Sequence, residues 1–365
     1  MFFTIHLKNT ENKKPLYQIK FNYFLFNFFC IFYLSYKIKF DSNKRYQVTL
    51  ITGIAGFIGS HLAEALQGRK LIGIDNFNDF YDPEIKRKNW AEVQLNSEAI
   101  LYEGDIRDIS FLDKVFSENK ISTVVHLAAM AGVRPSLKNP MLYEDVNIKG
   151  TINILECMKK NQIKNYVFAS SSSVYGESKE APFHENMKID HPISFYAATK
   201  KAGEELNHVY AHLYGIKTIN LRFFTVYGPR QRPDLAIHKF TRLIYDGLPV
   251  QIYGDGSFKR DFTYIEDILD GIIKSIYFTE KQKGFLFETL NLGESMTTDV
   301  NTMIALIEKY LKIKAQRQYL PPEPGDVPLT YADISKAKKL IGYAPKTKIE
   351  EGIEKFVGWF KKKNS

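Results

Sequence analysis

A tyrosine and a lysine four residues apart, Tyr196 and Lys200, are the first side chains in this sequence whose spacing suggests chemistry. On a helix, this spacing puts the phenol and the ammonium on one face. Tyrosine has a pKa of about 10, but a neighbouring cation favours its phenolate form, which can accept a proton. An earlier run of hydroxyls, Ser170 to Ser173, could hydrogen-bond a reacting oxygen. The pattern predicts oxidation of an alcohol with Tyr196 as the base; a surface pair is the alternative.

A glycine-rich segment predicts where the hydride acceptor binds. Gly53, Gly56 and Gly59 follow an apolar run and open a helix-like stretch. Such a turn lets the backbone approach a pyrophosphate, and the helix N-terminus supplies free N–H groups. Asp75 comes 22 residues after Gly53, where a carboxylate can bind the adenosine ribose and repel a 2′-phosphate. We therefore predict NAD, rather than NADP, as the cofactor.

Short apolar runs alternate with helix-like segments in the region that must position these residues. The runs cover 48–52, 71–75, 99–105, 123–128, 165–171 and 219–224, and the helix-like segments cover 57–68, 151–161 and 198–215. This alternation predicts an α/β fold, a Rossmann-type doubly wound parallel sheet. We assign residues 47–225 to an NAD-binding domain. Residues 226–365 are richer in turns and are assigned mainly to a smaller α/β C-terminal substrate lobe, with chain crossings between the lobes.

Composition excludes several classes of protein. The chain has 365 residues, of which 44% are hydrophobic, and this argues against a disordered chain. Its two cysteines, Cys30 and Cys157, exclude a disulfide scaffold and a multi-cysteine zinc site, and they suit a reducing, cytoplasmic location. The net charge is +9, but residues 1–46 carry +6 of it. The remainder has no compact basic motif, so we expect no nucleic-acid partner.

The first 46 residues form an atypical extension. Residues 21–36 are mostly apolar and are flanked by lysines, but the run is interrupted by polar residues and is shorter than the roughly 20 residues of a spanning helix. No small-residue cleavage site follows it. We interpret the extension as disordered or as the product of a start codon placed too far upstream, and expect no membrane association. Anchoring through residues 21–36 is the alternative.

From about residue 47 to residue 363, the sequence resembles the extended short-chain dehydrogenase/reductase family of nucleotide-sugar epimerases and dehydratases. The motifs that carry the resemblance are TGIAGFIG (52–59), IDN (74–76), GDIRD (104–108), HLAA (126–129), VNIKGT (146–151), SSSSVYG (170–176), YAATK (196–200), RFFTVYGP (222–229), RDFTYIEDI (260–268) and PGDV (324–327). The resemblance implies that NAD is the cofactor, that a UDP-sugar is the substrate and that the protein is a homodimer joined through helices at 140–161 and 196–214.

The resemblance also implies residue roles. Ser171 would be the catalytic hydroxyl beside Tyr196 and Lys200. The cofactor cleft would contain, besides these two and the three glycines with Asp75, the residues Phe57, Ile58, Asn76, Asp105, Ile106, Leu127, Ala128, Ala129 and Asn147. Arg232 and Arg260 would bind the diphosphate of the substrate and Asp326 its nucleoside ribose, with Arg134 as a further phosphate contact.

Three hydroxyl residues distinguish between members of the family. Its dehydratases carry an acidic pair where this chain has Ser172 and Ser173, and its decarboxylases keep an acid at the second position, so the resemblance implies epimerisation. Thr225 stands where UDP-galactose 4-epimerases have asparagine, and RFFTVYGP is most similar to UDP-glucuronate 4-epimerases. Hydroxyls of Ser172, Ser173 and Thr225 could receive a uronate carboxylate.

We therefore predict NAD-dependent 4-epimerisation of UDP-glucuronate to UDP-galacturonate through a 4-keto intermediate. A 4-epimerase acting on UDP-glucose and UDP-galactose, or on their N-acetyl forms, is the alternative, since YGDG at 253–256 departs from the glucuronate pattern. A non-catalytic NAD-binding scaffold is a third alternative, because a fold can persist after its catalytic activity is lost.

Three histidines are set aside. His208 and His212 have the i, i+4 spacing of metal ligands but lack an accompanying HExxH pattern, so we expect surface or subunit-contact roles and no metal. His126, in a predicted strand beside the cofactor loop, is expected to be structural.

Overall fold

The computed structural model describes residues 47–178, 180–321 and 327–364, and its central element is a seven-stranded sheet. The strand order is β11-β6-β5-β4-β1-β2-β3, and every neighbouring pair is parallel. The strands are β1 (Val48–Thr52), β2 (Lys70–Asp75), β3 (Ile100–Glu103), β4 (Ile121–His126), β5 (Asn165–Ser171), β6 (Lys217–Phe223) and β11 (Phe287–Leu292). The predicted doubly wound parallel sheet is confirmed.

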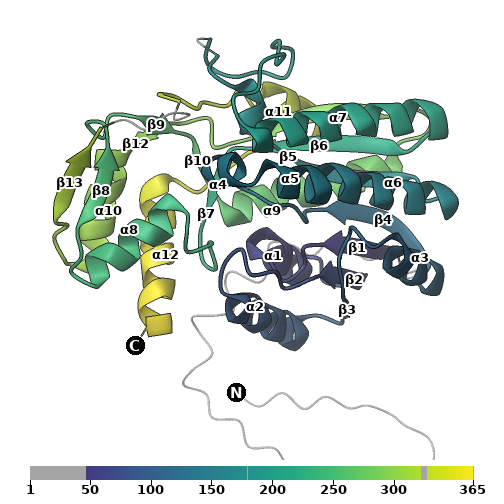
Figure 1. The fold of residues 1–365 in the computed structure, drawn as a ribbon, viewed down its shortest axis with the longest axis horizontal. Coiled ribbons are helices and arrows are strands. Elements are labelled where there is room, and N and C mark those ends of the chain that lie inside the picture. Colours follow the sequence, from purple (N-terminus) through teal and green to yellow (C-terminus); the bar gives the residue numbers. More distant parts are fainter. Residues whose placement is uncertain (1–46, 179, 322–326, 365) are drawn as a thin grey trace, which may run out of the picture. The chain divides into compact units, whose positions relative to one another are not determined.

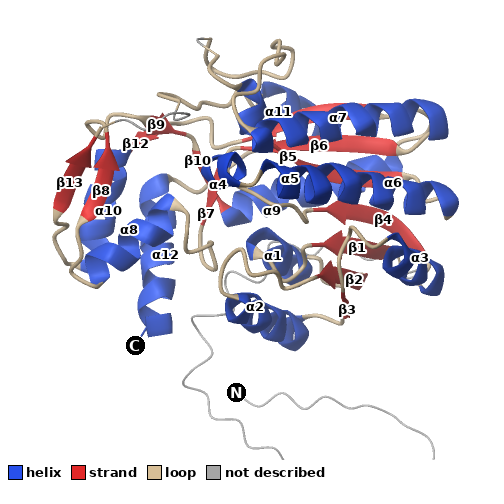
Figure 2. Ribbon diagram, in the orientation of Figure 1, coloured by secondary structure: helices blue, strands red, loops and turns tan. Residues whose placement is uncertain are grey.

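Helices cover both faces of this sheet (Figures 1 and 2). Contacts group α1 (Phe57–Ala65), α2 (Pro83–Asn96), α9 (Ile265–Lys281) and α11 (Ser335–Ile341) on one face, and α3 (Ile109–Glu118), α6 (Gly150–Lys160) and α7 (Phe195–Tyr214) on the other. Successive strand residues point to opposite faces. In β1, Ile51 packs with the α1 and α9 side and Leu50 with the α3, α6 and α7 side, which explains why this strand carries apolar residues on both faces.

The remaining elements form a smaller lobe and the connections. Short elements α4 (Val133–Lys138), α5 (Pro140–Glu144) and η1 (Asp145–Lys149) lead into α6, and η2 (Ser172–Tyr175) follows β5. The smaller lobe contains α8 (Ala236–Tyr245), α10 (Val300–Leu311), α12 (Ile349–Asn364) and the parallel pair β8 (Val250–Tyr253) and β13 (Arg317–Leu320). Two further pairs are β7 (Thr225–Tyr227) with β10 (Phe262–Tyr264), and β9 (Lys259–Arg260) with β12 (Thr298–Asp299).

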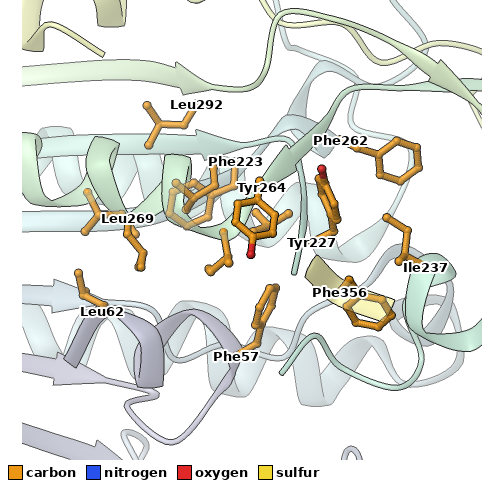
Figure 3. Packing of buried hydrophobic residues seen from close by; sticks show 14 of the residues in the cluster. Phe57, Leu62, Phe223, Tyr227, Ile237, Phe262, Tyr264, Leu269, Leu292 and Phe356 are labelled. Carbon is orange, nitrogen blue, oxygen red and sulfur yellow. The ribbon is translucent and has the colours of Figure 1, made fainter. Parts of the chain in front are cut away.

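The chain passes between the main sheet and the smaller lobe more than once. Strand β11 and helix α9 come from the range assigned mainly to the smaller lobe, yet β11 pairs with β6 and α9 packs against β5 and β6. One buried cluster joins the two parts: Phe57 and Leu62 of α1 belong to it together with Tyr264 and, from α12, Phe356 (Figure 3). This continuous core holds the smaller lobe against the ends of the central strands.

No helix among the described residues is long and apolar enough to cross a membrane. The segment 21–36, considered above as an anchor, lies outside the described residues.

Candidate active site

A cavity of about 500 Å³ lies at the carboxyl ends of the central strands. Its lining includes residues that end or follow six of the strands, among them Gly53, Asp75, Leu127 and Ser171, and it also includes Arg260 of β9. The chain leaves β1 toward one face of the sheet and β4 toward the other, so a crevice opens between them. Ligands of doubly wound sheets bind at such a switch point.

The glycine turn after β1 is sterically fitted to close approach. Gly53 has a φ of +72°, and a Cβ there would lie 3.0 Å from the backbone of Ala128. A Cβ on Gly59 would lie 2.1 Å from the carbonyl oxygen of Gly53. Helix α1 begins after Gly56 without any side-chain cap, so its first N–H groups are available to an external acceptor. The turn therefore fits a pyrophosphate, as the glycine pattern predicts.

Asp75 lies at the end of β2 in the same cavity. Its Oδ2 accepts a hydrogen bond from the Ala55 amide at 3.1 Å and its Oδ1 one from the Phe77 amide at 2.9 Å. Burial raises the pKa of this carboxyl, while those bonds and the charge of Lys86 oppose the rise. The carboxylate is thus held rigidly beside the glycine turn, where it could accept ribose hydroxyls.

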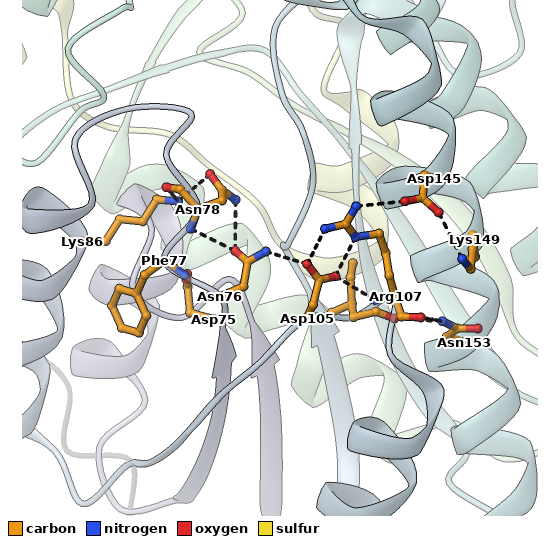
Figure 4. Close-up of polar contacts among 11 residues, drawn as sticks. Asp75, Asn76, Phe77, Asn78, Lys86, Asp105, Arg107, Asp145, Lys149 and Asn153 are labelled. Carbon is orange, nitrogen blue, oxygen red and sulfur yellow. Dashed lines mark hydrogen bonds and ion pairs between the residues drawn. The ribbon is translucent and has the colours of Figure 1, made fainter.

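A polar network begins at Asn76, the residue after Asp75 (Figure 4). Asn76 donates to Asp105 Oδ2 at 2.8 Å, and the Arg107 guanidinium bridges Asp105 and Asp145 at 2.8 and 2.9 Å. Burial of Asp105 opposes its ionisation, but the hydrogen bonds from Arg107 and Asn76 outweigh it and lower its pKa to about 2. The cavity lining includes Asn76, Asp105 and Ile106, three of the residues predicted to contact the cofactor.

Sequence reasoning missed the loop between β2 and α2 as part of the cavity. The cavity lining includes Asn78, Phe80 and Tyr81 of this loop and Lys86 of α2. Lys86 is buried and donates from Nζ to the Asn78 carbonyl and to Asn78 Oδ1, both at 2.9 Å. The adjacent aromatic residues Phe80 and Tyr81, in a short loop directly after β2, are the sequence signal that could have identified this wall.

The loop after β4 forms the opposite wall. Leu127, Ala128 and Ala129 line the cavity there, but Asn147 lies behind the wall. Its side-chain Oδ1 accepts a hydrogen bond from the Met130 backbone amide at 2.8 Å. Its Nδ2 donates to the Met130 carbonyl and to the Thr199 hydroxyl, each at 3.0 Å. Asn147 therefore ties this loop to α7 rather than contacting the cavity directly.

Helix α7 presents Tyr196 and Lys200 to the cavity. Its N-cap is Ser194, whose Oγ accepts the Ala197 amide at 3.1 Å, so Tyr196 falls in the first turn. A Cβ on Gly203 would lie 2.5 Å from the ring of Phe168 in β5, so the glycine permits α7 to pack closely on the sheet. Lys200 reaches the backbone of β5, where its Nζ donates to the Ala169 carbonyl at 2.7 Å. The predicted pair shares one face of the helix.

The hydroxyl segment, residues 170–173, meets Tyr196 across the end of β5. Ser171 Oγ accepts hydrogen bonds from the Ser173 amide at 3.1 Å and from Ser173 Oγ at 3.0 Å. Ser171 and Tyr196 both line the cavity, and the Ser171 hydroxyl lies near enough to the Tyr196 phenol to lower its pKa. Ser171, Tyr196 and Lys200 are thereby brought together although the sequence separates them.

Burial dominates the electrostatics of these groups. It raises the pKa of the Tyr196 phenol, while the bond from Ser171 and the charge of Arg232 lower it. The sequence suggested Lys200 as the cation beside the phenol; the structure adds Arg232. Burial also lowers the pKa of Lys200 to about 7, although the charge of Glu204 raises it.

The predicted substrate residues divide into three groups by position. Ser172, Ser173, Thr225, Arg232 and Arg260 line the cavity. Arg134 is not among the described lining residues; its guanidinium lies 4.7 Å above the ring of Tyr253. Asp326 lies outside the described residues.

The carboxylates among the described lining residues lie at one end of the cavity. Among the described lining residues, the only acidic side chains are Asp75 and Asp105, at the ends of β2 and just after β3. The hydroxyl segment and Thr225 lie on the side of β5, β6 and β7, where the described lining contains Arg232 and Arg260 as its charged groups besides Lys200. This half of the cavity is suited to anionic groups and offers no described acid for eliminating water.

The three histidines noted in the sequence, His126, His208 and His212, belong to no metal-binding group among the described residues. No group of three His, Cys, Asp or Glu side chains among the described residues could hold a metal ion. His208 and His212 stack at 6.4 Å, and His208 packs edge-on against Phe287. His126 is buried between Thr52 and Thr151, at 2.6 and 3.1 Å, and burial lowers its pKa to about 3.

Known proteins match this chain over most of its length. Residues 50–356 match the family described as GDP-mannose 4,6 dehydratase. A UDP-glucuronate 4-epimerase of Thermodesulfobacterium geofontis is 45% identical over 315 residues, which cover 86% of this chain and 95% of that protein.

Solved structures of nucleotide-sugar epimerases are also similar to this chain. UDP-glucuronic acid 4-epimerase from Bacillus cereus, in complex with UDP-glucuronic acid and NAD, is similar with a TM-score of 0.80 and 36% identity over 87% of this chain and 99% of that one. A Thermotoga maritima UDP-glucose 4-epimerase with UDP-glucose is similar with a TM-score of 0.79 and 32% identity, over 87% of this chain and 100% of that one.

Proposed function

Since the chain belongs to the GDP-mannose 4,6-dehydratase family of extended short-chain dehydrogenases/reductases, we propose that it is an NAD-dependent isomerase, the 4-epimerase that interconverts UDP-glucuronate and UDP-galacturonate. The family name covers several reactions, so the site must distinguish between them. The observation that carries the proposal is the pairing of Tyr196 and Ser171 with a neighbouring cavity wall that has hydroxyls and arginines but no described carboxylate.

The residues of the cavity fit NAD. The glycine turn would hold the pyrophosphate, Asp75 the adenosine ribose, and Lys200 the nicotinamide ribose. A relative of 36% identity has NAD bound in a structure of similar fold. When bound, NAD would supply the acceptor and donor of the hydride at C4 of the sugar.

Tyr196 and Ser171 would act on the oxygen at C4. The Ser171 hydroxyl, oriented by Ser173, hydrogen-bonds that oxygen, and the Tyr196 phenolate takes its proton as the alcohol becomes a ketone. In the reverse direction, Tyr196 returns the proton. Arg232 would stabilise the negative charge of the phenolate, and Lys200, whose Nζ lies 6.0 Å from the centroid of the Tyr196 ring, would add to this effect in its ammonium form.

Epimerisation also needs the 4-ketosugar to turn over within the cavity. Arg232 and Arg260 would hold the diphosphate while the sugar rotates about that linkage and presents its other face. The Arg232 guanidinium pairs with Asp234 at 2.6 Å and lies 5.0 Å from the ring of Phe80, so it is already oriented at the cavity wall.

The hydroxyl-lined wall favours a uronate and disfavours loss of CO2. Ser172 and Thr225 could each donate a hydrogen bond to the carboxylate of the sugar, and Ser173 could do so by turning its proton away from Ser171. The 4-keto form of a uronate is a β-keto acid, and it loses CO2 most readily when the bond to its carboxylate is perpendicular to the plane of the ketone. A wall that fixes the carboxylate, with no described acid near it, would keep the intermediate intact.

The test is a substrate panel. The purified protein is incubated with UDP-glucuronate, UDP-glucose or UDP-N-acetylglucosamine, and the products are identified by NMR. We expect UDP-galacturonate from the first and little turnover of the others. Conversion of a neutral sugar alone would favour the alternative 4-epimerase, for which the similarity to the Thermotoga maritima enzyme is the supporting observation. Failure to turn over any of the three would favour the NAD-binding scaffold.

We also propose that the protein is a homodimer in the cytoplasm. Large apolar side chains are exposed along α7 and on α4 and α5: Leu213 is 60% exposed, Val209 45%, Phe195 49%, Met141 74% and Leu137 47%. A second copy would cover them. The free thiol of Cys157 is compatible with a reducing compartment. Light scattering coupled to size-exclusion chromatography measures the oligomeric state.

A further inference from the structure

A buried ion pair, Glu204 with Arg222, lies directly behind the candidate catalytic residues. Glu204 is one helical turn beyond Lys200 on α7 and two turns beyond Tyr196, so the three side chains share a face. From β6, Arg222 donates Nε to Glu204 Oε1 at 2.9 Å and Nη2 to Oε2 at 2.7 Å. Each residue is only 4% exposed. The pair is thus bidentate and shielded from water.

Two further hydrogen bonds join this pair to the first residue of the hydroxyl segment and to Tyr175, two residues beyond its end. Ser170 Oγ donates to Glu204 Oε1 at 2.5 Å, and Arg222 Nη1 donates to the Tyr175 phenol at 3.0 Å. Tyr175 in turn donates to Asn291 Oδ1 of β11 at 2.7 Å. The network therefore fixes β5, η2, β6 and β11 relative to α7, which carries Tyr196.

Glu204 is also the charge that acts on Lys200. Burial lowers the pKa of Lys200, and the charge of Glu204 opposes that effect. The other groups around the ammonium are the Ala169 carbonyl and the rings of Phe168 and Tyr196. From β4, the neighbouring His126 is neutral because burial lowers its pKa to about 3, and from β6 the Arg222 cation is paired with Glu204 itself.

Stability alone does not account for this arrangement. Removing two charges from water costs about as much as their attraction returns, so a buried ion pair adds little to the free energy of folding. We propose, building on the epimerase function above, that Glu204 is a positioning residue: it keeps Lys200 in its ammonium form and aligns the hydroxyl segment with Tyr196. Arg222 holds the Glu204 carboxylate in place for both tasks.

The test is the dependence of kcat on pH in the holoenzyme. In Glu204→Gln, Lys200 loses its stabilising negative charge and gives up its proton at lower pH. The alkaline limb of kcat should therefore move to lower pH by about one unit, a roughly tenfold loss at its upper end. Because this variant leaves Arg222 unpaired and can fail to fold, the charge-neutral double variant Glu204→Gln/Arg222→Gln is measured beside it, with the same shift expected.

Two controls separate this role from a structural one. Glu308→Gln removes another buried helix carboxylate from its arginine partner, Arg317, but in the smaller lobe and outside the cavity lining, so its pH profile should match the wild type. Glu204→Asp keeps the charge and should retain the wild-type alkaline limb even if kcat falls.

A uniform fall in kcat with an unshifted limb in both Gln variants would overturn the inference. Absence of turnover by the wild type would instead overturn the proposed function, and the inference with it.

Discussion

The carbonyl oxygen of Gly53 occupies the space that a side chain on Gly59 would need, because a Cβ at position 59 would lie 2.1 Å from that oxygen. The Cα of Ile54 would be only 2.8 Å away. Both obstacles are backbone atoms, which cannot rotate aside. The contact therefore couples the turn after β1 to the first turn of α1, and the geometry of the proposed pyrophosphate site depends on it.

Gly59→Ala should abolish NAD binding and destabilise the fold. Relieving the clash requires α1 to move away from the turn, and we expect a loss of at least about 2 kcal/mol in the free energy of unfolding. Bound NAD is measured by chromatography after denaturation, and stability by thermal melting. The matched control is Gly358→Ala on α12, where a Cβ meets nothing within 4 Å. That exposed helix position should gain about 0.5–1 kcal/mol, and an equal loss in both variants would contradict the steric argument.

Lys86→Met should weaken NAD binding without altering the chemical step. Lys86 holds the loop after β2 through two bonds to Asn78, and its charge opposes the rise in the pKa of Asp75. Its loss should free the loop and leave Asp75 more readily protonated, with NAD affinity reduced about tenfold. Isothermal titration of the NAD-free protein measures this affinity. Lys88→Met, an exposed change on the same helix, is the control and should bind NAD normally.

Tyr196→Phe should remove epimerase activity while the protein remains folded and loaded with NAD. The phenol is the proposed proton acceptor at O4, and general base catalysis typically contributes about 10²–10⁴ in rate. Product formation is followed by NMR, and NAD content and the melting temperature by the assays above. Activity near that of the wild type would exclude Tyr196 as the base.

Thr225→Val should discriminate between uronate and neutral sugars. The backbone N–H of Thr225 bonds the Asp261 carbonyl at 3.0 Å and is retained, so the change replaces only a hydroxyl by a methyl group. A lost hydrogen bond to a carboxylate is worth about 1.5–3 kcal/mol, which corresponds to a KM for UDP-glucuronate raised about tenfold or more. The KM for UDP-glucose should be unchanged. Equal effects on both substrates would show that Thr225 does not contact the carboxylate.

Glu294→Gln should stabilise the protein above neutral pH. Burial raises the pKa of this carboxyl to about 7, and its Oε2 is buried with no hydrogen-bond partner in the part of the chain that the structure describes. Because the folded state holds the proton more tightly than the unfolded state, stability falls as the pH rises from the ordinary glutamate pKa through about 7. The amide cannot ionise and escapes this loss. We expect a gain on the order of 1 kcal/mol at pH 8 and none at pH 5, from melts at both values.

If Glu294→Gln instead destabilises the protein equally at both pH values, the carboxylate contributes through its bond with Lys348. That bond is 3.2 Å long, and the Lys348 side chain is 62% exposed, so the lysine can turn toward water when its partner is neutral. We therefore expect the difference in stability between Glu294→Gln and the wild type to depend on pH.

Much of the fold was accessible from the sequence because it rests on local patterns. The apolar runs become strands when both faces of a sheet are covered, and the turn after β1 needs glycine at position 53, where φ is +72°, and at position 59, where a Cβ would meet the Gly53 carbonyl. The pairing of Tyr196 with Lys200 is likewise local, since one helix carries both. Boundaries were less certain: the predicted run 99–105 ends as β3 at Glu103.

Contacts between distant segments had no such local signal. That Ser171 faces Tyr196, that Lys86 enters the cavity, and that Arg222 pairs with Glu204 depend on how β5, α2, β6 and α7 pack. Placement of β11 beside β6 depends on pairing between segments far apart in the chain. The residue types and their spacing determined the chemistry this chain is equipped for. Burial decided the pKa values of the groups concerned, and burial exists only once the tertiary structure has excluded water.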